Sequence, residues 1–183
     1  MPTFINDLPL HVLVVHAVVV LVPLAVLGAV TVAVWPAARR RYGWLVVAVT
    51  AVATVAIPVA TSSGEGLEHR LPRTALLEAH TRLGDDLLVF VAGLLVALTA
   101  FVVLHHRATV VGRRIQPADH GGPGTAARTA AGPPRVLAGV LAAVTVALAV
   151  VAAVQVYRIG DSGARAAWAD THYVTTGTGR SSG

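Results

Sequence analysis

The sequence contains no cysteine and no lysine, and few of its 183 residues are charged. Without cysteine the chain can form no disulfide, cannot attach a c-type haem covalently and cannot ligate an iron–sulfur cluster through thiolates. Any metal or cofactor must therefore be held by His, Asp, Glu or backbone oxygens. Charged residues make up 13% of the chain and hydrophobic residues 55%, and the mean hydropathy is +0.72. This composition indicates a membrane protein and not an ordinary soluble domain.

Long apolar stretches occupy most of the chain. Four of them carry no Asp, Glu, Lys or Arg, and each is long enough to cross roughly 30 Å of hydrocarbon as a helix. A helix also satisfies its own backbone polar groups in lipid. We therefore expect an all-α integral membrane protein: a single four-helix bundle over residues 1–173, with spans at about 8–35, 43–62, 86–106 and 135–158.

The arginines predict how the chain is threaded through the bilayer. The loops between the first and second spans and between the third and fourth hold eight Arg and one acid, whereas the other side holds six Arg and eight acids. By the positive-inside rule the Arg-rich loops are cytoplasmic and both termini lie outside. Because topology accounts for the net charge of +5, we expect the lipid bilayer and no nucleic acid as a partner.

Three segments outside the spans have their own patterns. Residues 107–134 are rich in Ala, Gly and Pro, which predicts a disordered cytoplasmic linker, and residues 174–183 predict a disordered tail. Asp161 precedes residues 162–167, which are small apart from Arg165, and Trp168, and this pattern predicts an N-cap followed by a short interfacial helix on the outer side after the fourth span.

Ionisable residues collect at the outer ends of all four expected spans. His80 shares a helical face with Leu83, Gly84 and Leu87, so its side chain should face the bundle interior. Imidazole and carboxylate ligands together suit Zn, Cu(II), Fe or Mn. The candidate metal ligands are His11, His16, Glu65, His80, Asp85 and Asp161, and the histidines among them that could hold a cofactor such as haem b are His11, His16 and His80.

Three interpretations of this outer layer are open. In the first, it binds a transition metal or a haem b for a redox role, with His11 and His80 as ligands and Glu65 and Asp161 completing or orienting the shell. In the second, the same residues are caps and interhelical hydrogen bonds in a non-enzymatic scaffold or accessory subunit without a cofactor. A proton-linked transporter has less support, because no inverted repeat is visible. No nucleophile–base arrangement indicates an enzyme.

Four short motifs carry a resemblance to a known family. They are Leu8–His16, Ser63–Glu68, His80–Asp85 and Tyr157–Trp168, and in this order and spacing they resemble a bacterial four-helix membrane family, domain of unknown function 2231. The resemblance implies a bacterial plasma (inner) membrane location. Some members are fused to Rieske or c-type cytochrome domains, which implies a redox or respiratory association, so we expect a separate redox protein or a second copy of the chain as a partner.

The resemblance also implies which positions matter. Many relatives have His where Asp161 stands here, which weakens a haem-ligand role for this position and leaves a metal-carboxylate role open. The matching positions are His11, His16, Gly64, Glu65, His80, Gly84, Asp85, Gly160, Asp161, Gly163 and Trp168.

Overall fold

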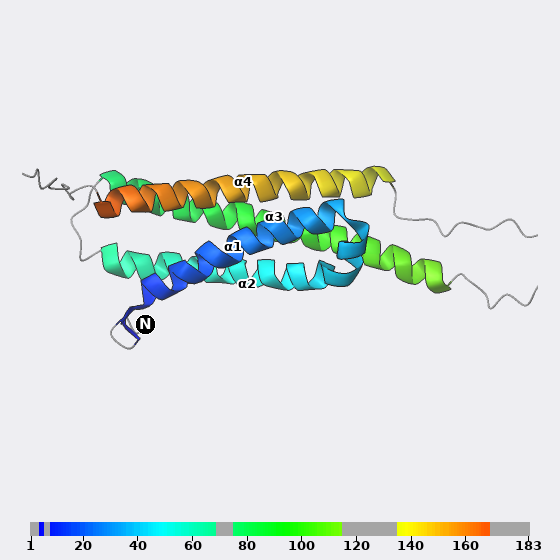
Figure 1. Cartoon of the computed structure of the whole chain (residues 1–183), viewed down its shortest axis with the longest axis horizontal. Coiled ribbons are helices and arrows are strands. Elements are labelled where there is room, and N and C mark those ends of the chain that lie inside the picture. Colours follow the sequence, from blue (N-terminus) through cyan, green and yellow to red (C-terminus); the bar gives the residue numbers. More distant parts are fainter. Residues whose placement is uncertain (1–3, 6–7, 69–74, 115–134, 169–183) are drawn as a thin grey trace, which may run out of the picture.

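Four long helices make up nearly all of the part of the chain that the computed structural model describes, residues 4–5, 8–68, 75–114 and 135–168. They are α1 (Leu10–Val34), α2 (Pro36–Glu68), α3 (Ala75–Arg114) and α4 (Arg135–Trp168). Successive helices run in opposite directions and lie side by side (Figure 1). All four are long and apolar enough to cross a membrane, which confirms the expected all-helical, four-span architecture.

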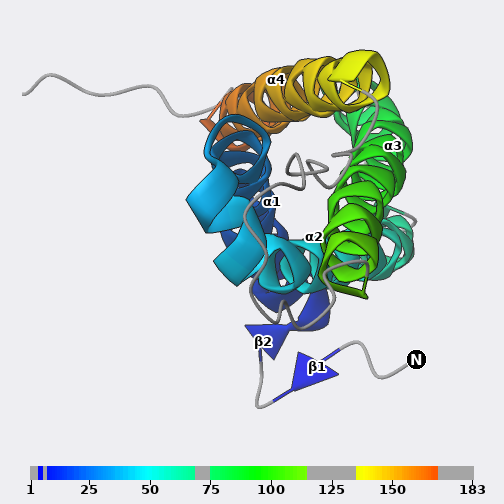
Figure 2. The same cartoon turned by 90° about the vertical axis from the view of Figure 1, so that its right-hand side faces the viewer.

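The helices follow one another around the bundle. Helix α1 packs against α2 and α4, and α3 packs against the same two helices. In the end-on view, α1 and α3 therefore lie diagonally across from each other (Figure 2). This order brings the starts of α1 and α3 and the ends of α2 and α4 together at one end of the bundle, called here the histidine end. The opposite end, which carries Arg39–Arg41, Arg107 and Arg135, is called the arginine end.

The helices are longer than the expected spans. Helix α2 begins at Pro36, so only Trp35 separates it from α1, and it continues to Glu68. Residues 107–114, assigned above to the disordered linker, form the last turns of α3. A helix need not end where the hydrocarbon of the bilayer ends, because its end depends on local capping and packing. The remainder of the expected linker and the expected tail lie outside the described residues.

Two further details differ from the expectation. Residues Phe4–Ile5 (β1) and Leu8–Pro9 (β2) form a small antiparallel pair, with Phe4 opposite Pro9 and Ile5 opposite Leu8, where the first helix was expected to begin. At the other end of the chain, α4 runs unbroken to Trp168, so residues 162–168 are its last turns and not a separate interfacial helix. Asp161 accordingly lies inside a helix and is not an N-cap.

The bundle interior is filled mainly by Val, Ala and Leu. Val22, Ala29, Val91 and Leu94 are fully or almost fully buried in one continuous apolar cluster contributed to by all four helices. Two buried hydroxyl groups are satisfied within their own helices: Thr50 donates to the Val46 carbonyl oxygen and Thr145 to that of Leu141, both at 2.7 Å. The core therefore holds polar side chains without needing a partner on another helix.

Gly28 allows α1 to pack closely against α2. A Cβ placed on Gly28 would lie 2.8 Å from Cγ1 and 3.0 Å from Cγ2 of Val46. Valine is stiff at χ1 in a helix, so its side chain cannot rotate out of the way. Small residues at such positions allow membrane helices to pack closely, which is how they associate in the absence of a hydrophobic driving force.

Replacing Gly28 should therefore destabilise the bundle. We expect Gly28→Ala to lower the free energy of unfolding by about 1–3 kcal/mol through overpacking, measured by denaturant unfolding in detergent micelles. Gly139 is the matched control, because a Cβ there would meet nothing within 4 Å. Gly139→Ala should be neutral or gain up to about 1 kcal/mol from helix propensity. Equal effects of the two substitutions would contradict the close α1–α2 contact.

Candidate functional site

The six predicted ligands all belong to helices that meet at the histidine end. His11 and His16 are in the first turns of α1, Glu65 is in the last turn of α2, and Asp161 is near the end of α4. His80 and Asp85 follow the start of α3 at Ala75. The side chains of His11, Glu65 and His80 lie outside the described residues. Those of His16, Asp85 and Asp161 are described, and all three are exposed.

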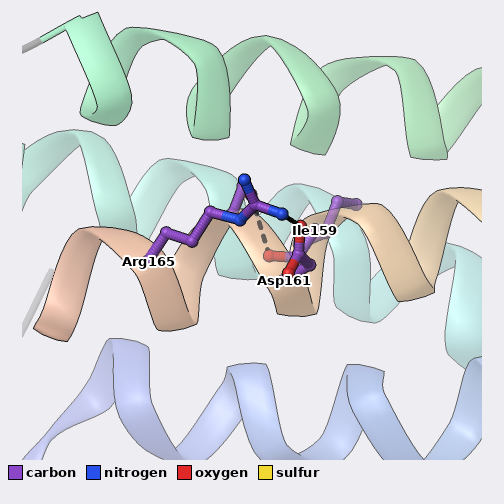
Figure 3. A network of polar contacts seen from close by, with 4 residues as sticks. Ile159, Asp161 and Arg165 are labelled. Atoms are coloured by element: carbon purple, nitrogen blue, oxygen red, sulfur yellow. Dashed lines mark hydrogen bonds and ion pairs between the residues drawn. The ribbon is translucent and has the colours of Figure 1, made fainter. Parts of the chain in front are cut away.

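Asp161 has a partner on its own helix. The Nη2 of Arg165 lies 2.9 Å from the Asp161 Oδ2, an ion pair one turn apart along α4 (Figure 3). The Arg165 side chain is 71% exposed and that of Asp161 is 44% exposed, and exposed pairs of this kind contribute little to stability. Beside it, the Ser162 hydroxyl donates to the Ile159 carbonyl oxygen at 2.9 Å. Asp161 is thus part of a local contact on the surface of α4.

Among the side chains that the structure describes, no three His, Asp or Glu residues are grouped closely enough to hold a metal ion. His16, Asp85 and Asp161 therefore do not form a metal site among themselves.

One contact between α2 and α3 shows how the two helices are aligned near the histidine end. A Cβ placed on Gly84 would lie 3.5 Å from the Thr61 Cγ2, an ordinary van der Waals distance. Three residues further along α3, Leu87 is 3% exposed. The face of α3 that carries Gly84 and Leu87 therefore faces the bundle, as the sequence pattern predicted for that face.

At the arginine end, the structure shows a cluster that sequence reasoning missed. Arg39 of α2 donates from Nε to the Val32 carbonyl oxygen at 3.1 Å and from Nη2 to that of Ala33 at 3.2 Å. Both carbonyl groups are in the last turn of α1, where no intrahelical donor is available. The guanidinium also lies 4.4 Å from the centre of the Phe101 ring of α3. Arg39 thus caps α1 and joins it to α3.

His105 completes this cluster in a defined protonation state. Its Nε2 lies 2.6 Å from Arg39 Nη1, and its Nδ1 lies 2.9 Å from the Phe101 carbonyl oxygen. A guanidinium can only donate, so Nε2 must accept, and Nδ1 must carry the proton that is donated to the carbonyl. The geometry therefore assigns a neutral imidazole protonated at Nδ1.

The sequence carries a signal for the Arg39 cap of α1. The charge pattern predicts that Arg39–Arg41 are topology determinants and predicts no role for His105. Pro36 favours an end of the preceding helix next to it, so an arginine one turn later is well placed to bond the last carbonyls of that helix. The partner on α3 could not be found this way, because it is 66 residues away in the sequence.

Removing the acceptor for Arg39 should weaken the contact between α2 and α3. We expect His105→Ala to lower the free energy of unfolding in detergent by about 1.5 kcal/mol, since hydrogen bonds to charged groups contribute on this order. The control is His106→Ala, the exposed neighbour, whose ring centre lies 6.3 Å from that of Trp44 in a T-shaped arrangement and which should have a much smaller effect. A loss no larger for His105 than for His106 would argue against the Arg39–His105 bond.

Comparison with known proteins agrees with this architecture. The model of a family described as "Predicted membrane protein (DUF2231)" matches residues 7–176. No curated protein and no solved structure matches the chain.

Proposed function

The chain belongs to the DUF2231 family of predicted membrane proteins, and from this premise we propose that its histidine end binds a transition metal ion for a redox role in the membrane. Four antiparallel helices meet at that end, and each contributes an ionisable residue near its terminus. Such residues are costly next to hydrocarbon, and where they occur they commonly serve function.

One observation carries the proposal: α3 packs against α2 at Gly84, where an added Cβ would lie 3.5 Å from the Thr61 Cγ2. Helices α2 and α3 are antiparallel and rise equally per residue, so four residues beyond Thr61 and four residues before Gly84 are again at one level. Those residues are Glu65 and His80, and each shares a helical face with the residue in contact. The register thus supports a carboxylate and an imidazole at the same level of the α2–α3 interface.

His11 would add a second imidazole from α1. Because α1 and α3 are diagonal in the bundle, a group held by both His11 and His80 would lie near the bundle axis, beside Glu65 of α2. Imidazole and carboxylate donors suit Zn, Cu(II), Fe or Mn, of which Cu, Fe and Mn can change oxidation state. A haem b held by the two histidines alone would leave Glu65 without a role, so a metal ion fits this donor set better.

The proposal is tested on full-length protein purified in detergent after growth with metals and haem supplied. We expect near-stoichiometric metal by elemental analysis, lost in His80→Ala and in Glu65→Gln and retained in His106→Ala at the opposite end. An absorption band characteristic of haem, lost in His11→Ala and His80→Ala, would show that the bound group is a haem b and not a single metal ion. A folded protein that carries neither would overturn both.

A scaffold or accessory subunit without a cofactor is the second candidate. It is favoured by the exposed Asp161–Arg165 pair and the exposed side chains of His16 and Asp85, which are typical of interface polar residues. This function predicts that His80→Ala lowers the midpoint of thermal unfolding while metal and haem content stay the same as in the unsubstituted protein.

A further inference from the structure

A groove lies at the arginine end, between the first turns of α2 and the last turns of α3, and has a volume of about 320 Å³. This is within the range of small-molecule sites, about 300–1,000 Å³. Its polar and aromatic walls are Arg39, Arg40 and Trp44 from α2 and His105, His106 and Thr109 from α3. It is far from the proposed metal site, at the other end of the helices, and does not depend on it.

The groove is positively charged without a carboxylate from the described part of the chain to balance it. Arg39 and Arg40 are adjacent in the sequence and both line it. The three carboxylates whose side chains are described, Asp85, Asp86 and Asp161, are all at the histidine end. Cations placed together in this way attract an anion from outside the protein.

Some of the hydrogen-bond donors in the groove already have acceptors within the protein, and others are available to a ligand. Three of the N–H groups of Arg39 are used by Val32, Ala33 and His105. A guanidinium has five N–H donors, so two remain. Arg40 is exposed and is not needed for the cap of α1. Thr109 donates its hydroxyl to the His106 carbonyl oxygen, so it offers no further proton. Arg40, with help from Arg39, is therefore the main anion-binding group.

The groove also lies where a membrane surface is expected. Trp35, Tyr42 and Trp44 are 61%, 46% and 52% exposed around the arginine end, and exposed aromatic rings of this kind mark the level of the lipid head groups. Val110, which is 39% exposed, adds an apolar wall. An anion that enters the groove from the level of the lipid head groups would carry an attached apolar group.

We propose that this groove binds a phosphate-bearing anion, namely the head group of an anionic phospholipid in the leaflet at the arginine end. Arg40 pairs with the phosphate oxygens, and the acyl chains lie along the exposed apolar surface below Trp44. Basic pockets between membrane helices on the cytoplasmic side are known to suit such head groups, and the positive-inside rule predicts that the arginine end is cytoplasmic.

The test is a titration of the full-length protein in detergent with short-chain phosphatidylglycerol, short-chain phosphatidylcholine and inorganic phosphate, followed by Trp fluorescence and thermal unfolding. We expect phosphatidylglycerol to bind in preference to phosphatidylcholine. Arg40→Gln should weaken this binding about tenfold or more, as for the loss of a charged hydrogen bond. Arg135→Gln removes the same charge at the same end from an exposed residue outside the groove, and should weaken binding about fivefold or less.

The other outcomes either identify the source of the bound phosphate group or contradict the proposed site. Inorganic phosphate that binds as tightly as phosphatidylglycerol, and is lost in Arg40→Gln, would support the anion site and identify a water-soluble phosphate compound as its ligand. Equal weakening by Arg40→Gln and Arg135→Gln would show general surface attraction and overturn the proposal, as would the absence of binding by both anions. Circular dichroism of each variant checks that the helices are intact.

Discussion

In hydrocarbon, every backbone N–H and C=O group must find a partner within the protein, and the rest of this structure follows from that constraint. Four helices satisfy nearly all of these groups internally. The buried hydroxyl groups of Thr50 and Thr145 obey the same constraint by bonding to carbonyl groups one turn back. Where α1 ends, the last carbonyl groups lack an intrahelical donor, and Arg39 supplies it from the next helix. The need to satisfy backbone groups in lipid thus explains the contact of Arg39 with the end of α1.

Because lipid is as apolar as the side chains, close packing must hold the helices together. The Val, Ala and Leu side chains of the core are similar in shape, so they do little to specify one packing arrangement of the helices. Gly28 against Val46 and Gly84 against Thr61 provide specific points of approach. The first brings α1 close to α2, and the second determines which residues of α2 and α3 are level with each other. Through the second contact, Thr61 of α2 and Gly84 of α3 lie at the same level near the histidine end.

The two ends of the bundle differ in chemistry, and each proposed ligand suits the end at which it binds. At the arginine end, one arginine and one neutral histidine join α1, α2 and α3, and a groove beside them retains positive charge. At the histidine end, imidazole and carboxylate residues come from all four helices. A membrane protein with unlike ends can bind an anion on one side and a cation on the other, because the helices between them keep the two charge distributions apart.

The apolar runs of the sequence by themselves determined that there are four spanning helices, since length and hydropathy suffice for a helix in lipid. The apolar runs did not determine where each helix begins and ends. Residues 107–114, expected in a linker, are helical, and residues 162–168 continue α4, because outside hydrocarbon the end of a helix depends on local capping and packing. Only the tertiary structure decided that Arg39 meets His105 and that Thr61 meets Gly84, since these partners are far apart in sequence and are brought together by the antiparallel packing of α2 and α3.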